Sequence, residues 1–286
     1  MTPELEQAIA DNVSAALEED LGGGDLTAAL IDPDAVVGAT IVARESIVVA
    51  GQPWVDEVFS RLDSEIVVDW YIGDGGTADA DDVVCKLVGN ARHLLSGERT
   101  ALNFLQTLSA TATTAAAWVD AVRGTRATIL DTRKTIPGLR QAQKYAVRIG
   151  GASNHRTGLF DAILIKENHI RAAGSIPAAL QAANASVAST DDDTLVEIEV
   201  ESLDELRKAL DSGATRILLD NFSLDDLKAA VDINAGYGYV AAELEASGNI
   251  SLDNVREIAE TGVDYISTGA LTKNVKAADL SMLLSI

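Results

Sequence analysis

A basic segment without any acidic residue interrupts this strongly acidic chain. Residues 132–160 carry six Lys or Arg side chains and neither Asp nor Glu, although the chain average predicts about 4.5 acidic residues there. A positive segment in so acidic a protein indicates anionic ligands or an acidic packing partner. The cations are Arg133, Lys134, Arg140, Lys144, Arg148 and Arg156, and His155 adds a titratable ring beside the last.

The centre of this basic segment has the spacing of one helix face. Its three central cations are four residues apart, on a helix predicted to start at Pro137 and to end at Gly150. A solvated face and an interface both remain open for this stripe. The flanking pairs Arg133–Lys134 and His155–Arg156 fall outside the helix, so we expect these pairs to bind anions.

The elements that position these residues alternate from about residue 125 onward. Apolar strands start 21 to 25 residues apart in the second half of the chain, which is typical of βα units in a parallel sheet. Helices are predicted over 202–212, 223–232 and 251–261, each with a serine N-cap (Ser202, Ser223 and Ser251). The predicted strands cover 127–131, 161–166, 195–200, 216–220, 239–245 and 264–268.

Polar or ionisable residues are found toward the end of each predicted strand, where strands buried on both faces should be apolar. In a (β/α) barrel the carboxyl ends of several strands supply the active site. Alternation along the strand places Glu197 and Glu199 on one face, so both can point inward. The polar groups are Asp131, Lys166–Glu167, Glu197 with Glu199, Asp220–Asn221, Glu243 with Glu245, and Ser267–Thr268.

The first part of the chain mixes element types. A helix over 4–20 is followed by a Gly-rich turn and by strand-like runs at 39–43, 47–49, 66–70 and 83–88, and a long helix over 97–122 links this part to the barrel. We therefore expect an α+β sandwich domain over residues 1–108, with the tail 273–286 packed against it, and a catalytic barrel over 109–272.

Charge and composition restrict the partners. The 286 residues carry a formal charge of −22, which argues against nucleic acid or an anionic membrane as the main partner. The sequence contains no long apolar run, and its first residues lack the basic region followed by an apolar run that is typical of a signal peptide. We therefore expect a cytoplasmic protein without a membrane span. The single cysteine, Cys85, excludes an internal disulfide. The acidic surface suggests adaptation to a saline cytoplasm.

One block of the sequence resembles a known family. The segment DTRKTIPGLRQAQKYAVRIGGASNHRTGLFDAILIKENHI (131–170) is similar to the signature of the quinolinate phosphoribosyltransferases, which are type II phosphoribosyltransferases. Ala152 and Lys273 depart from the family pattern, which usually has Gly and often His there. Supporting stretches are EEDLGGGDLT (18–27), LSGERTALNFLQ (95–106), VEIEVESLDEL (196–206), ILLDNF (217–222), LEASGNI (244–250) and VDYISTGALT (263–272).

The resemblance implies an α/β protein whose C-terminal part is an open (β/α) barrel of about seven strands. It also implies conversion of quinolinate and phosphoribosyl pyrophosphate, with Mg²⁺, to nicotinate mononucleotide, pyrophosphate and CO₂ in NAD biosynthesis. The family supplies Arg99 from the neighbouring subunit, so a homodimer is expected, and assembly into hexamers stays open.

The residue chemistry agrees with those substrates. Arginine suits a planar dicarboxylate because its fork matches carboxylate geometry, and Mg²⁺ prefers carboxylate and phosphate oxygens. Glycine-containing loops after late barrel strands often bind phosphate. The residues expected to bind the dicarboxylate are Arg99, Arg133, His155, Arg156 and Lys166. Lys134 is expected to bind the pyrophosphate, Glu199 and Asp220 to bind the metal, and these three residues together with Lys166 to take part in catalysis. The residues expected to bind the 5′-phosphate are Ser247, Gly248, Asn249, Gly269 and Ala270.

Three other functions remain open from the sequence. A paralogous phosphoribosyltransferase of the molybdenum-transport accessory type should lack part of the dicarboxylate site. A non-catalytic anion-binding barrel would not need the pair Glu199 and Asp220. A barrel aldolase or isomerase with a Schiff base on Lys166 would leave the flanking cations without a role.

Overall fold

The computed structural model describes residues 1–188 and 194–285. These residues form two compact units: unit 1 is Met1–Ala116, Thr135–Gly151 and Leu271–Ile286, and unit 2 is Ala117–Lys134 with Ala152–Ala270. The prediction placed 109–116, 135–151 and 271–272 in the barrel, whereas these segments belong to unit 1. Ile286 lies outside the described residues. Among the described helices, none combines the length and the apolar character needed to cross a bilayer.

Unit 1 is built on an antiparallel sheet with the strand order β12-β1-β5-β3. The C-terminal strand β12 pairs with β1 over Ala43↔Leu280 to Gly38↔Ser285, which attaches the tail to this sheet. The strands are β1 (Val36–Ala43), β3 (Val67–Trp70), β5 (Val83–Asn90) and β12 (Leu280–Ser285), with a small β2 (Ile47–Val48) and β4 (Thr77–Ala78) pair. This confirms the α+β character predicted for the N-terminal part.

Helices of unit 1 bury their apolar faces in one core with this sheet. Leu5, Ile9 and Val13 on one side of the first helix are buried in a cluster with Trp54 and Phe59 of the second. The first helix is capped by Thr2, whose hydroxyl accepts from the Leu5 amide (3.4 Å). The helices are α1 (Pro3–Leu21), α2 (Gln52–Leu62), α3 (Ala91–Ala121) and α4 (Arg140–Ile149), with a 3-10 turn at Ala28–Leu30. The last residues of α3, from Ala117, and the first residue of the short α10 (Ala270–Lys273) belong to unit 2.

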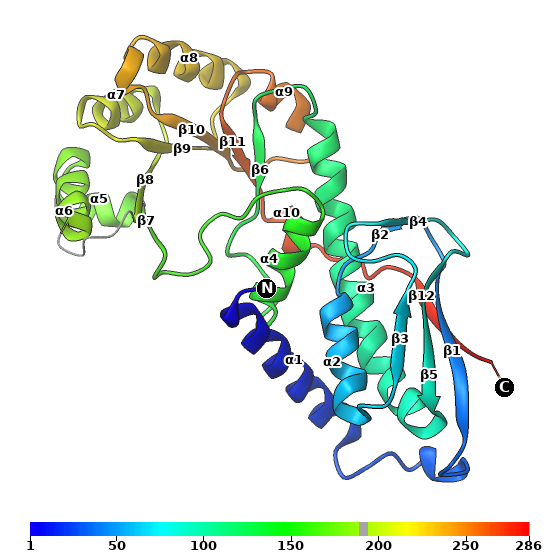
Figure 1. Ribbon diagram of the computed structural model, residues 1–286. Helices are drawn as coiled ribbons and strands as arrows, with labels where there is room; N and C mark the ends of the chain where they lie inside the picture. The colour runs from blue at the N-terminus through cyan, green and yellow to red at the C-terminus, as the bar shows by residue number, and fades with distance from the viewer. Residues whose placement is uncertain (189–193, 286) are drawn as a thin grey trace. The chain divides into compact units, whose positions relative to one another are not determined.

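Unit 2 contains one parallel sheet with the strand order β6-β11-β10-β9-β8-β7 (Figure 1). Its strands are β6 (Thr128–Leu130), β7 (Ala162–Ile165), β8 (Leu195–Val200), β9 (Arg216–Asp220), β10 (Glu243–Ser247) and β11 (Tyr265–Ser267). Where a seventh strand would pair with β6, the described residues form a single parallel bridge between Leu130 and Ser153. The Ser153 amide donates to the Ile129 carbonyl (2.9 Å), so the 152–154 segment continues the sheet beside β6 without becoming a full strand.

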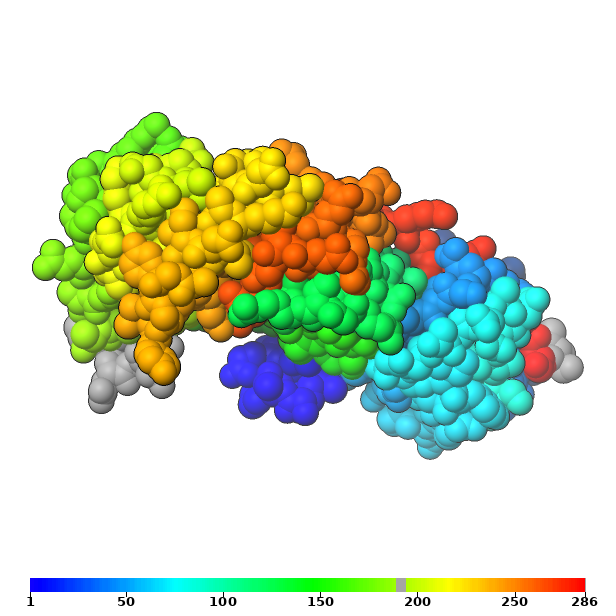
Figure 2. All heavy atoms as spheres, turned by 90° about the horizontal axis from the view of Figure 1, so that it is seen from above, coloured from blue at the N-terminus to red at the C-terminus, as the bar shows by residue number. Residues whose placement is uncertain are grey.

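Helices follow the strands of unit 2 in chain order and cover the sheet from outside. They are α5 (Glu167–Ala173), α6 (Ile176–Ala188), α7 (Leu203–Asp211), α8 (Leu224–Ala235) and α9 (Val255–Ala259). Neighbours contact each other from α6 to α9, and Figure 2 shows this succession from yellow-green through yellow to orange. The βα alternation predicted from the sequence is confirmed.

Several element boundaries differ from the sequence prediction: the long helix predicted from residue 97 begins at Ala91, and the helix predicted from Pro137 begins at Arg140. The strand expected from residue 239 begins at Glu243, because a 3-10 turn at Gly238–Val240 comes first and the Asn234 amide group exchanges two hydrogen bonds with Ala242 (2.7 and 2.9 Å). The helix expected from Ser251 begins only at Val255, with Asn254 as its N-cap. Ser202 and Ser223 do cap their helices, with hydroxyls accepting from the Glu205 and Asp226 amides.

Candidate active site

A pocket of about 310 Å³ lies at the carboxyl ends of the strands of unit 2. It is formed by alternate residues of the strands, because side chains of one parity face the same side of a sheet. The strand residues that face the pocket include Leu164, Glu199, Leu218, Glu245 and Ser267. The full lining is Thr132, Arg133, Lys134, His155, Arg156, Leu164, Lys166, Glu199, Leu218, Asp220, Glu245, Ser247 and Ser267.

Two arginines of the basic segment line this pocket together. Arg133 follows β6, and Arg156 lies in the segment that precedes β7, where its guanidinium donates to the Ala162 carbonyl (3.2 Å). Burial and the nearby positive charge of Arg133 lower the pKa of Arg156. An anion between the two guanidinium groups would relieve this repulsion, so the pair is suited to a carboxylate-rich ligand.

The segment that carries His155 and Arg156 is anchored by carboxylates at both ends. The buried Asp131 accepts from the His155 amide (2.9 Å) and from the Asn154 side chain (2.6 Å). Asp161 accepts from the Thr157 and Gly158 amides (2.6 and 2.9 Å). Although partial burial opposes it, these amide bonds lower the pKa of Asp161. The backbone around Arg156 is therefore held before any ligand arrives.

Lys134 lies against a glycine of a late barrel loop. A Cβ added to Gly269 would be 2.9 Å from Cδ of Lys134 and 3.2 Å from its Cβ. Thr132 accepts from the Lys134 amide (3.1 Å) and fixes the turn that carries the lysine. The structure thus brings together two residues, Lys134 and Gly269, that the sequence assigned to the pyrophosphate and the 5′-phosphate.

The loop after β10 is shaped for close approach of its backbone. Gly248 has a φ of +93°, and a Cβ there would lie 2.3 Å from Oδ1 of Asn221. Asn221 and Asn249 also have positive φ and are joined by a side-chain hydrogen bond (3.0 Å). Ser247 lines the main pocket, while Gly248 and Asn249 line a smaller hollow with Asn221.

Carboxylates line the same pocket as the cations. Glu199 on β8 forms an ion pair with Lys166, the residue that follows β7. Asp220 ends β9 and accepts from the side chain of Asn221 (2.7 Å). Hard oxygen donors of this kind fit Mg²⁺, so the donor set agrees with the metal expected from the sequence.

A buried cluster of charges lies below these groups, and the sequence prediction missed its role. His155 Nε2 is 2.9 Å from Oε2 of Glu197 and 3.6 Å from Oε1 of Glu245. Arg216 pairs with Glu245 and Glu243 at 3.0 Å each. We define Arg216, Glu197 and Glu245 as the buried ion cluster. The prediction placed Glu243 at a strand end, which was wrong because Glu243 is the first residue of β10.

The protonation of this cluster follows from burial and from its neighbours. Burial favours a neutral ring at His155, but the hydrogen bond to Glu197 and the charges of Glu245 and Glu197 outweigh it and raise its pKa. Burial and the charge of Glu197 raise the pKa of Glu245. Burial is outweighed at Glu197, whose pKa is lowered by His155 and Arg216.

The same three ligand atoms of His155, Glu197 and Glu245 lie within 4.8 Å of one another, as in a metal site. Arg216 pairs with both carboxylates, and its Nε is 3.5 Å from Oε1 of Glu197. The guanidinium therefore supplies the positive charge that these carboxylates need. The cluster fits an internal ion pair better than a divalent cation.

Several predicted residues lie elsewhere. Arg99 is exposed on α3 in unit 1 and is not among the described residues that line the pocket. Ala270 starts α10, where its amide donates to the Thr268 hydroxyl (3.1 Å).

In the helical stripe of the basic segment Lys144 is only 1 % exposed, so the solvated alternative is wrong for this lysine.

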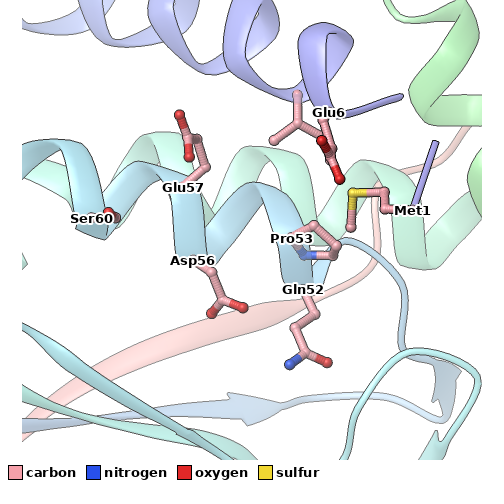
Figure 3. Close-up of a pocket in the computed structure, with 8 residues that line it drawn as sticks. Met1, Glu6, Gln52, Pro53, Asp56, Glu57 and Ser60 are labelled. Atoms are coloured by element: carbon pink, nitrogen blue, oxygen red, sulfur yellow. The ribbon is translucent and has the colours of Figure 1, made fainter. Parts of the chain in front are cut away.

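Unit 1 has a groove of its own, between α1 and α2 (Figure 3). Glu6, Asp56 and Glu57 line it, and no cationic side chain is among the described lining residues. Burial raises the pKa of Asp56. This groove does not fit an anionic substrate, in contrast to the pocket of unit 2.

Comparison with known proteins agrees with the geometry. Residues 25–109 match the N-terminal domain and residues 111–283 the C-terminal domain of the quinolinate phosphoribosyl transferase family. The chain is 43% identical to the nicotinate-nucleotide pyrophosphorylase [carboxylating] of Mycobacterium leprae, over 96% of each protein. It is 41% identical to the chloroplastic rice (Oryza sativa) protein of that name, covering 94% of this chain and 76% of the rice protein.

A solved structure shows the same arrangement. The nicotinate-nucleotide pyrophosphorylase of Francisella tularensis superposes with a TM-score of 0.93 at 44% identity, covering 100% of this chain and 98% of that one. Fold and site together define an enzyme of the phosphoribosyltransferase class, built on an open parallel barrel. The chain belongs to the quinolinate phosphoribosyl transferase family.

Proposed function

We propose that this protein transfers the phosphoribosyl group of phosphoribosyl pyrophosphate to quinolinate and releases CO₂, forming nicotinate mononucleotide for NAD biosynthesis. The observation that carries the proposal is the shared lining of one pocket by Arg133, Lys134, Arg156 and Lys166. Quinolinate holds two adjacent carboxylates on a pyridine ring, and two arginine forks with a lysine can neutralise both. A catalytically silent anion-binding barrel has no use for the carboxylates in the same lining.

The substrate positions follow from where these groups lie. Arg133 and Arg156 orient the dicarboxylate, with Lys166 toward its second carboxylate. Lys134 meets the pyrophosphate, and the backbone of the Ser247-Gly248-Asn249 loop and of Gly269-Ala270 meets the 5′-phosphate. Glycine at 248 and 269 supports this assignment, since a side chain there would collide with Asn221 or with Lys134.

Glu199 and Asp220 would hold Mg²⁺, which neutralises negative charge on the pyrophosphate when it is bound. The ion pair of Lys166 with Glu199 would have to loosen if Glu199 held the metal, because a metal and a lysine compete for the same carboxylate. This exchange would leave the Lys166 ammonium available for a substrate carboxylate.

The reaction needs no covalent bond to the protein. The pyridine nitrogen attacks ribose C1, and the bond from C1 to the pyrophosphate oxygen breaks with its electrons on the leaving group. Lys134 stabilises that charge, while Glu199 and Asp220 favour the positive charge that develops on the ribose. The ring is then a pyridinium, so the electrons of the C2–carboxylate bond can stay on C2 as CO₂ leaves. A proton taken up from solvent at C2 completes nicotinate mononucleotide.

The assembly is part of the proposal. Arg99 is expected to complete the site of a neighbouring subunit in a homodimer, and higher assembly to a hexamer stays open. The cytoplasmic location likewise stays a prediction of the sequence.

Product analysis tests the function. Purified protein with Mg²⁺, phosphoribosyl pyrophosphate and quinolinate should form nicotinate mononucleotide, resolved by chromatography. Nicotinate in place of quinolinate should give far less product, because one carboxylate leaves part of the cationic lining unmatched. Equal turnover of nicotinate, or no product from quinolinate, would contradict the proposal.

A further inference from the structure

The buried ion cluster below the pocket reaches the substrate site through its own member Glu245 and through His155, which contacts Glu197. His155 and Glu245 line the pocket, whereas Glu197 and Arg216 are not among its described lining residues and are 1 % and 7 % exposed. Glu197 and Arg216 therefore do not meet the substrate. Any effect they have on substrate binding has to pass through a neighbour.

The His155 ring is held from both sides. Its Nε2 contacts Glu197 at 2.9 Å, and its Nδ1 accepts from the backbone amide of Arg156 at 2.7 Å. In the neutral form of the ring, an acceptor at Nδ1 leaves the single proton on Nε2, which then donates to Glu197. The imidazole thus forms a rigid link between a buried carboxylate and the backbone of a substrate-site arginine.

Glu197 is held by the charge of Arg216, whose Nε lies 3.5 Å from Oε1 of Glu197 without a hydrogen bond between them. The Cα partners of Arg216 are Glu197 on β8 and Glu243 on β10, so the three lie in one row across adjacent strands. The guanidinium pairs with Glu243, Glu245 and Glu197, and it lies 3.4 Å from the centre of the Tyr265 ring. The Tyr265 hydroxyl donates to Glu243 (3.1 Å). These contacts leave the guanidinium little freedom.

We propose that Glu197 and Arg216 are positioning residues for the substrate dicarboxylate: the charge of Arg216 holds Glu197, Glu197 fixes the His155 ring, and the ring fixes Arg156 in the pocket. This inference rests on the proposed function and identifies two residues outside the pocket on which its specificity depends. Buried ion groups seldom add net stability over apolar packing. Because Glu197 and Arg216 lie directly beneath an anion site, we assign them to the positioning of substrate-binding residues rather than to stability.

The experiment compares Glu197→Leu with Glu197→Gln in the full-length enzyme. Leucine has a similar volume but accepts no hydrogen bond, so the KM for quinolinate should rise ~10-fold or more, as for lost partners of a ligand-orienting histidine. Glutamine keeps an acceptor for Nε2–H and should restore that KM to within ~3-fold of the wild type. The KM for phosphoribosyl pyrophosphate should change less in both variants. Glu260→Leu, in the exposed pair with Arg256, is the matched control and should leave both KM values unchanged.

A double-mutant cycle tests whether Glu197 acts through His155. If it does, Glu197→Leu adds ~3-fold or less to the quinolinate KM of His155→Leu, because residues that act through one contact are not additive. Multiplicative effects would overturn the inference, as would an unchanged quinolinate KM in Glu197→Leu or a glutamine variant no better than leucine.

A second variant distinguishes loss of folding from loss of substrate positioning. Should Glu197→Leu fail to fold, Arg216→Lys gives the test instead, because lysine keeps the charge but not the fork. This variant should raise the KM for quinolinate by a larger factor than the KM for phosphoribosyl pyrophosphate. An equal change in both KM values, or none, would overturn the inference. Failure of the proposed function would instead appear in the wild type, as absence of nicotinate mononucleotide.

Discussion

Gly269 and Lys134 approach each other so closely that no side chain fits between them: a Cβ on Gly269 would lie 2.9 Å from Cδ of Lys134. The two residues come from opposite ends of the unit 2 sequence, and adjacent strands β11 and β6 bring them together. The lysine that we assign to the pyrophosphate is therefore placed by a loop that we assign to the 5′-phosphate.

Replacement of Gly269 by alanine should move Lys134. We expect kcat/KM for phosphoribosyl pyrophosphate to fall ~10-fold, which equals about 1.4 kcal/mol of transition-state stabilisation. Steady-state kinetics with saturating quinolinate measures it. Gly23→Ala is the control, since nothing lies within 4 Å of an added Cβ there. Unchanged kinetics in Gly269→Ala would remove Lys134 from this role.

The two cations after β6 should be essential for turnover. Arg133→Ala or Lys134→Ala should lower kcat/KM by ~100-fold or more, since each removes a charge aimed at a substrate anion. Circular dichroism and the melting temperature should stay near those of the wild type. Near-wild-type turnover of a folded variant would show that its side chain does not meet the substrates.

Metal removal should stop the reaction. Treatment with EDTA should abolish product formation, and added Mg²⁺ should restore it. Asp220→Asn should need a higher Mg²⁺ concentration for half-maximal rate, because an amide binds a hard cation less well than a carboxylate. A rate that is independent of chelator, or an unchanged Mg²⁺ requirement in Asp220→Asn, would contradict the assignment of this carboxylate.

The loop that carries Arg156 should depend on the ionised form of Asp161. Because the folded-state pKa of this carboxyl lies below its ordinary value of 3.8, its contribution to stability is present above about pH 3.8 and is lost as the pH falls through the lowered pKa. Asp161→Asn should therefore melt below the wild type at pH 7, with the gap closing toward pH 3. A pH-independent gap in scanning fluorimetry would show that charge is not the cause.

The acidic surface predicts a response to salt. With a formal charge of −22, self-repulsion should destabilise the fold at low ionic strength, and the Debye length falls to ~3 Å at 1 M salt. The melting temperature should therefore rise from low to molar KCl. A flat profile would count against adaptation to a saline cytoplasm.

The sequence predicts the βα alternation and the pocket cations because both follow from local patterns. Ser202 and Ser223 cap helices as expected, and Arg133, Lys134, Arg156 and Lys166 line one pocket. The start of β10 was misplaced because the Asn234 contacts with Ala242 that turn the chain before it are tertiary.

The buried ion cluster could not be predicted from single strands. The strand at 216–220 looks apolar apart from its two ends, Arg216 and Asp220. Only the register shows that Arg216 lies between Glu197 and Glu243. Opposite charges at inward-facing positions of three predicted strands were the available signal. Burial of Lys144 was likewise hidden, since its spacing fits an exposed helical stripe equally well.

Release of CO₂ tests the central claim most directly. Quinolinate labelled in its 2-carboxylate is incubated with the enzyme, Mg²⁺ and phosphoribosyl pyrophosphate, and labelled CO₂ and pyrophosphate are both quantified. The account predicts equal amounts of the two, and no CO₂ when phosphoribosyl pyrophosphate is omitted, because only the alkylated ring can lose its carboxylate. Pyrophosphate release without CO₂, or CO₂ release without the ribosyl donor, would contradict it.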